Sequence, residues 1–165
     1  QNSCVVEAIL SENESDHYLI PNKPGWEPWQ NAVKVAPEAS DVRTTTLDQI
    51  VFDANIRPSL IKIDCEGFEP LILRGANHTL KSLRPAFMVE CNDKALKLAG
   101  TNRQELFNLF RKNYYTLFHL ASFTGFHPFG IEIDVDFPSS EFNFAAIPDD
   151  DANIARWLSS KEACS

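Results

Sequence analysis

The stretch Leu60-Ile61-Lys62-Ile63-Asp64-Cys65-Glu66-Gly67-Phe68-Glu69-Pro70 decides the fold. Its compact apolar run predicts a β-strand over 60–64. Gly67 indicates a sharp turn. Pro70 suits the first turn of a helix, because an N–H at that position would have no partner within the helix. The stretch therefore predicts a strand, a turn and a helix in direct succession.

A second strand is predicted directly after this helix. Pro85 ends the helix, and residues 86–90 form the strand. The alternation of strand and helix implies an α/β fold with a mostly parallel sheet covered by helices. One apolar face of the helix is formed by Ile72, Ala76, Leu80 and Leu83.

The flanking segments extend this pattern. The sequences Thr46-x-x-Gln49 and Thr101-x-x-Gln104 are capping boxes, and they predict helices that begin at these points. No helix separates the last two predicted strands, so we expect them to form an antiparallel pair at the C-terminal edge of the sheet. Strands are predicted at 5–10, 18–20, 114–120, 131–137 and 141–147.

Composition excludes several classes of function. The chain has 165 residues, with 15 Lys and Arg against 23 Asp and Glu, which gives a net charge of −8. Proteins that bind nucleic acid or anionic membranes through charge are cationic, so neither partner is expected. No apolar run approaches the roughly 18 residues of a membrane span, and no signal peptide is visible at the start of the chain.

The four cysteines are far apart and form no C-x-x-C pair. A zinc site of the usual spacing is therefore not expected. The cysteines are predicted to be free thiols in the reducing cytoplasm, and two disulfides in a secreted protein are the alternative.

Acidic residues follow both central strands. Asp64, Glu66 and Glu69 come after the first strand, and Glu90 ends the second. If the two strands are adjacent, these carboxyl groups converge at the end of the sheet where ligands bind in open α/β folds. Such carboxylates can bind sugar hydroxyls, remove a proton from a hydroxyl group, stabilise a sulfonium or hold a divalent metal.

A purely structural role is the alternative for each acid. Asp64 or Glu69 would then cap the helix that begins near Pro70, and Glu90 would pair with Arg74 or Arg84. We expect capping for Glu69 and a functional role for Asp64 and Glu66.

Residues 60–69 resemble the signature IKxDxEGxE of FkbM-type methyltransferases. The resemblance continues through Leu73-Arg74-Gly75-Ala76 and Arg84-Pro85 to Glu90, and the upstream Thr46-Leu47-Asp48 matches the TLD element of the family. It implies a partial Rossmann-like class I methyltransferase fold and the cofactor S-adenosylmethionine. The implied activity is methylation of a hydroxyl group on a sugar, a polyketide or a similar small molecule.

The resemblance also implies roles for individual residues. Asp64 or Glu66 is the candidate catalytic base, and Asp64 together with Lys62 would bind the cofactor. Hydrogen bonds to the substrate or cofactor are expected from Glu90 and Asn92. His119, at a predicted strand end, is an alternative base that faces the substrate. No metal is expected.

The sequence departs from the family pattern at the glycine-rich first motif. None of its six glycines forms a G-x-G, so residues 1–165 are expected to be a single domain that lacks the first two strands. The strand at 60–64 would then have one unpaired edge. Three explanations remain open: a fragment of an enzyme, a domain completed by a second chain, or a non-catalytic interaction module. A metal-dependent hydrolase is a weaker alternative.

Overall fold

The computed structural model describes residues 5–6, 8–14, 18–19, 34–35, 43–120, 131–134, 137–138 and 141–152. It confirms the predicted α/β class. A five-stranded mixed sheet has the order β5-β6-β9-β7-β8. These strands are β5 (Leu60–Ile63), β6 (Ala86–Glu90), β9 (Asn143–Pro148), β7 (Tyr115–His119) and β8 (Ile131–Glu132).

The predicted antiparallel pair of the last two strands is wrong. β5 and β6 are parallel, and β9 lies between β6 and β7, antiparallel to both. β7 therefore runs in the same direction as β5 and β6, and β8 pairs with β7 at the edge. The reason is burial: Phe144, Ala145 and Ala146 of β9 are buried, whereas both residues of β8 are exposed. A strand that buries both faces belongs inside a sheet.

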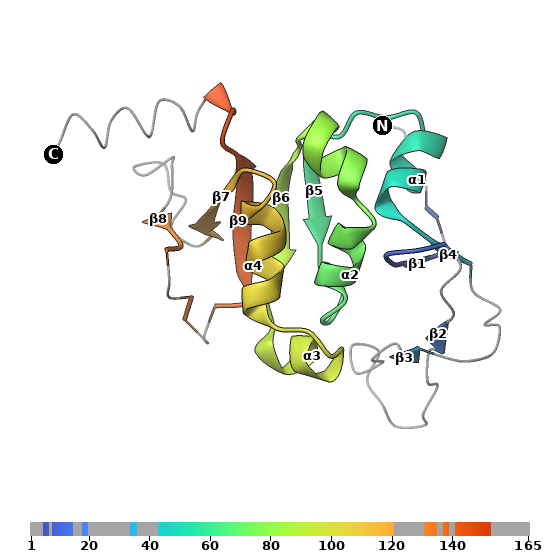
Figure 1. Ribbon diagram of the computed structural model, residues 1–165, viewed down its shortest axis with the longest axis horizontal. Helices are drawn as coiled ribbons and strands as arrows, with labels where there is room; N and C mark the ends of the chain where they lie inside the picture. The colour runs from blue at the N-terminus through green and yellow to red at the C-terminus, as the bar shows by residue number, and fades with distance from the viewer. Residues whose placement is uncertain are drawn as a thin grey trace, which may run out of the picture.

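Two small sheets lie beside the large one. β1 (Ile9–Leu10) pairs in parallel with β4 (Thr44–Thr45), and β2 (Tyr18–Leu19) pairs antiparallel with β3 (Lys34–Val35). Figure 1 places β1 and β4 on the β5 side of the large sheet. Within the described part of the chain β5 is an outer strand of the large sheet, which agrees with the unpaired edge expected for this strand.

The helix predicted from Pro70 to Pro85 is broken in two. α2 (Glu69–Arg74) ends at Gly75, and a π-helix (Thr79–Leu83) follows. A Cβ at Gly75 would lie 2.3 Å from the backbone oxygen of Ser11, so the chain passes too close for any larger residue. Asp48 of α1 caps the beginning of the second segment. Its carboxylate accepts hydrogen bonds from the N–H groups of Thr79, at 2.8 Å, and of His78.

Three further helices position the sheet. α1 (Leu47–Asp53) begins at Thr46, as predicted. α3 (Asp93–Leu98) was not predicted, although Asn92 caps it. α4 (Arg103–Arg111) is capped by Asn102, one residue later than the predicted Thr101. No helix in the described ranges is long and apolar enough to cross a membrane.

Aromatic side chains form the core between α4 and the sheet. Phe110 of α4 contacts Phe87 of β6 at a centroid distance of 5.2 Å and Phe144 of β9 at 5.8 Å, both edge to face. Each of these rings is buried. Figure 1 shows α2 and α4 in front of the same face of the sheet. This packing fixes α4 on β6 and β9.

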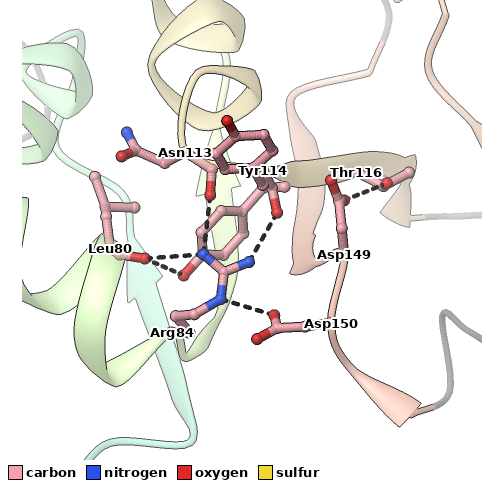
Figure 2. Close-up of polar contacts among 8 residues, drawn as sticks. Leu80, Arg84, Asn113, Tyr114, Thr116, Asp149 and Asp150 are labelled. Atoms are coloured by element: carbon pink, nitrogen blue, oxygen red, sulfur yellow. Dashed lines mark hydrogen bonds and ion pairs between the residues drawn. The ribbon is translucent and has the colours of Figure 1, made fainter.

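Arg84 organises the opposite end of the sheet (Figure 2). Its guanidinium donates to the carbonyl oxygens of Asn113 and Tyr114, each at 3.0 Å, and to the Asp150 carboxylate at 2.7 Å. It also lies over the Tyr115 ring, 5.2 Å from the centroid. We call this set of contacts the Arg84 network. It connects the π-helix to the beginning of β7 and the end of β9.

Candidate functional site

The four predicted acids gather where β5 and β6 end. Ile63 of β5 pairs with Val89 of β6, so Asp64 and Glu90 follow side by side. The pKa of Glu90 is raised to about 7 by burial and by the charges of Glu66, Asp64 and Glu69. We call these four acids the carboxylate cluster.

Asp64 is exposed and pairs with Lys62. The Lys62 Nζ donates to the Asp64 carboxylate at 2.6 Å. The hydrogen bond and the charge of Asp64 raise the pKa of Lys62. The two residues proposed to bind the cofactor are therefore neighbours, and Lys62 is the cation nearest to Asp64 among the described ion pairs.

Glu66 and Gly67 form a tight turn between β5 and α2. Both have positive φ, 49° and 97°, and the Phe68 N–H donates to the Cys65 carbonyl at 3.1 Å. Positive φ at both central residues is typical of a type I′ turn. A Cβ at Gly67 would lie 2.4 Å from the Ala95 carbonyl oxygen, so this turn packs directly against α3.

Glu69 does more than cap α2: besides its own N–H at the start of the helix, its carboxylate accepts from the turn that precedes the helix. It is 1% exposed, and its Oε1 accepts from the N–H of Cys65 at 2.9 Å and of Gly67 at 3.3 Å. Both donors precede α2. Burial raises the pKa of Glu69, and its Oε2 is buried without a hydrogen-bond partner.

Glu90 has neither of the arginine partners considered from the sequence. Arg74 pairs with Glu105, and Arg84 pairs with Asp150. The Oε2 of Glu90 is buried without a partner. An unpartnered buried carboxyl oxygen is costly, so it indicates either a protonated group or a place for a donor from a ligand.

Asn92 and His119 lie at the same end of the sheet. Asn92 lies two residues after the end of β6, and its Oδ1 accepts a hydrogen bond from the N–H of Lys94 at 3.1 Å. His119 ends β7, and its Nδ1 lies 2.9 Å from the Glu141 carboxylate. Asn92 is thus a helix cap, and whether either residue contacts a substrate stays a prediction.

β9 separates Glu90 from His119. Glu90 pairs with Asn143, and His119 pairs with the next residue, Phe144. Since strands in a sheet lie about 4.8 Å apart, two strand spacings put the backbones of Glu90 and His119 roughly 10 Å from each other. His119 lies at the same end of the sheet as the carboxylate cluster but does not belong to the cluster.

An apolar pocket of about 300 Å³ adjoins the turn at Glu66. The contribution of β1 could not be predicted from sequence, because this contact joins segments far apart in the chain. The pocket is lined by Ala8, Ile9, Leu10, Cys65, Glu66, Phe68 and Ile72. It combines apolar walls with one carboxylate.

The thiols and metal ligands give a simpler result. Cys65 is exposed and Cys91 is buried, and both are free, as predicted. Cys4 and Cys164 lie outside the described residues. Burial raises the pKa of Cys91 to about 12, so it is not a nucleophile at neutral pH. No group of three or more His, Cys, Asp or Glu in the described ranges could hold a metal ion.

Comparison with known proteins identifies a family for most of this region. The model of the methyltransferase FkbM domain matches residues 10–117, which include the turn and the carboxylate cluster. The mixed sheet with its helices is consistent with a Rossmann-like methyltransferase fold. No curated protein and no solved structure gives a significant match.

Proposed function

The chain belongs to the methyltransferase FkbM domain family, and we propose that it transfers a methyl group from S-adenosylmethionine to a hydroxyl group. The acceptor would be a sugar, a polyketide or a similar small molecule. The observation that carries the proposal is the carboxylate cluster at the ends of two adjacent parallel strands. In open α/β sheets this is the edge at which ligands bind.

The residues present fit such a cofactor. The buried, unpartnered Oε2 of Glu90 offers an acceptor for an ammonium or hydroxyl donor. Asp64 with Lys62 offers a carboxylate and an ammonium group to the charged part of the ligand. The apolar pocket beside Glu66 suits an apolar part of the cofactor. When bound, S-adenosylmethionine supplies an electrophilic methyl group.

The catalytic role falls to Asp64 or Glu66. Either carboxylate accepts the proton of the acceptor hydroxyl group as its oxygen becomes a nucleophile. Glu66 has a raised pKa, caused first by burial and then by the charge of Asp64, and this makes it a better proton acceptor than an ordinary glutamate. Glu90, Asn92 and His119 would orient the substrate through hydrogen bonds.

The edge of β5 suggests a partner. β5 is an outer strand in the described part of the chain, and the apolar pocket lies beside it. We infer that residues 1–165, acting as one domain, pair along this edge with a further strand from a preceding segment or a second chain. Unpaired strand edges readily accept another strand.

Calorimetry with S-adenosylhomocysteine tests the proposal. The titration compares this chain, an N-terminally extended form, and the variants Asp64→Asn and Glu66→Gln in whichever form binds. We expect at least one of the two forms of the chain to bind S-adenosylhomocysteine. In the variant that lacks the base, methyl transfer to a panel of hydroxyl compounds should fall at least about tenfold.

Asp53→Asn is the matched control, since Asp53 is an exposed carboxylate on α1 outside the cluster. Full methyl transfer by both Asp64→Asn and Glu66→Gln would contradict the assigned base.

A non-catalytic interaction module is the second candidate. It is favoured by the absence of a G-x-G from the sequence, since glycine-rich turns let a backbone approach a nucleotide closely. If neither form of the chain binds S-adenosylhomocysteine, this candidate replaces the enzyme.

A cytoplasmic location is also part of the proposal. The exposed free thiol of Cys65 supports it, because reducing compartments preserve such thiols. Cell fractionation with an antibody against the chain tests the location, and recovery from the culture medium would contradict it.

A further inference from the structure

Glu66 occupies a backbone conformation that its residue type disfavours. Its φ is 49°, in the left-handed region that L-residues other than Asn and Asp rarely adopt. Turns with positive φ at both central positions favour Asn, Asp or Gly at the first of them. A glutamate in this place therefore needs something in the surroundings that holds the turn.

Glu69 supplies that support. Its Oε1 accepts from the N–H of Cys65 and from the N–H of Gly67, the two residues that flank Glu66. One oxygen thus holds both sides of the strained residue. Glu69 itself is 1% exposed and belongs to α2, so its position is set by the core.

The opposite side of the turn is blocked by α3. The place of a Cβ at Gly67 lies within 2.4 Å of the Ala95 carbonyl oxygen, so the turn cannot move toward this helix. The turn is therefore held between the Glu69 carboxylate and the α3 backbone. Its strained residue, Glu66, contributes to the wall of the apolar pocket.

We propose that Glu69 is a positioning residue, which holds the turn at residues 65–67 so that the Glu66 carboxylate faces the pocket. This inference rests on the proposed function for the role of Glu66. In this proposal Glu69 acts through its hydrogen bonds to the backbone of the turn and not on the substrate. Strain at a functional residue persists only where neighbouring contacts over-determine it, and these two bonds are such contacts.

Two substitutions separate the acceptor from the charge. Glu69→Gln keeps a side-chain oxygen at the same reach and removes the charge. Glu69→Asp keeps the charge and shortens the side chain by one methylene, so its oxygen no longer reaches both N–H groups. The proposal predicts that Glu69→Gln resembles the unmodified chain and that Glu69→Asp does not.

Amide hydrogen exchange measured by NMR reads out the turn directly. In Glu69→Asp the amides of Cys65 and Gly67 should exchange at least about tenfold faster, the effect expected for a lost hydrogen bond. In Glu69→Gln they should exchange as in the unmodified chain. Val89, in the middle of β6, serves as the internal reference. Unchanged exchange in Glu69→Asp would overturn the proposal.

A measurement on the unmodified chain tests the proposal even if a variant fails to fold. Scalar coupling across hydrogen bonds should connect the amide nitrogens of Cys65 and Gly67 with the side-chain carboxyl carbon of Glu69. If neither coupling is present, the proposal is wrong whatever the variants do. Leu73→Ala removes buried volume from the same helix and controls for general loosening.

Methyl transfer then tests the functional half. Glu69→Asp should lower the turnover number at least about fivefold, and Glu69→Gln should restore it. A merely structural role would lower activity in Leu73→Ala as well, after correction for the folded fraction. If neither the unmodified chain nor its N-terminally extended form transfers a methyl group, the proposed function fails, while the exchange and coupling data still decide whether Glu69 holds the turn.

Discussion

The two ends of the sheet satisfy their polar groups in opposite ways. In the Arg84 network the charged group donates to backbone carbonyls and to one carboxylate, so cation and acceptors match. In the carboxylate cluster four acids face one ion-paired lysine, and two buried carboxyl oxygens have no partner. The well-partnered contacts therefore lie at one end of the sheet, and the proposed binding site lies at the other.

This difference has a physical meaning. A buried polar group with all its partners contributes to stability, and one without a partner costs stability unless a ligand supplies the partner. The Arg84 network leaves little for a ligand to do. The carboxylate cluster keeps acceptors that a ligand can satisfy, as expected for a site in which function is favoured over stability.

Gly67→Ala should have the largest effect on stability. The added methyl group would collide with the Ala95 carbonyl at 2.4 Å, and φ is +97°. We expect the free energy of unfolding to fall by about 3 kcal/mol or more, measured by urea denaturation.

Gly100→Ala is the matched control for Gly67→Ala. It has positive φ, +78°, with nothing within 4 Å of the new methyl group. It should cost only about 1 kcal/mol, the backbone term alone. Equal losses in the two variants would show that the turn does not depend on its close contact with α3.

Arg84→Ala should remove the support of the opposite end. The side chain is 20% exposed, and its loss leaves the Asn113 carbonyl oxygen without its donor, whereas the Tyr114 carbonyl oxygen keeps only the Asp149 N–H. We expect a loss of about 2–3 kcal/mol in urea denaturation.

Lys81→Ala, an exposed position on the same π-helix, is the control for Arg84→Ala and should change stability by less than about 0.5 kcal/mol. A loss in Arg84→Ala no larger than that of the control would contradict the view that this end is the stabilising one.

Glu90→Gln should change how stability depends on pH. The pKa of Glu90 is raised from 4.5 to about 7, so the folded protein holds this proton more tightly than the unfolded chain does. The resulting stabilisation is complete below pH 4.5 and is lost as the pH rises through about 7. Because Glu90 is partly exposed, solvent screening reduces the effect to about 1–2 kcal/mol.

Urea denaturation between pH 5 and pH 8 checks this dependence. The unmodified chain should lose stability across the range, and Glu90→Gln should lose less. Asp53→Asn, outside the cluster, should follow the unmodified chain. Parallel curves for all three proteins would exclude a role for Glu90 in the dependence.

Lys62→Met should have the smallest effect. The ion pair with Asp64 is exposed, with side-chain exposures of 53% and 43%. Exposed pairs of this kind contribute about 0.5 kcal/mol, and salt screens them. The loss should therefore shrink in 1 M NaCl. A loss that is independent of salt would indicate packing by the lysine stem instead of charge.

Local chemistry determined much of the fold from sequence alone. The run at 60–64 with Gly67 and Pro70 predicts β5, its turn and α2, because each depends on neighbouring residues only. Thr46 caps α1 for the same reason. The position of the acids after two strands also predicted the carboxylate cluster, since parallel strands end at the same edge.

Contacts between distant segments were decided only by the tertiary structure. The helix breaks at Gly75 because Ser11 approaches it, and β9 enters the sheet because both of its faces are buried. The hydrogen bonds of Glu69 depend on how α2 packs on the core. A sequence pattern states which residues prefer which local conformation, but the packing of segments far apart in the chain determines which of those preferences are realised.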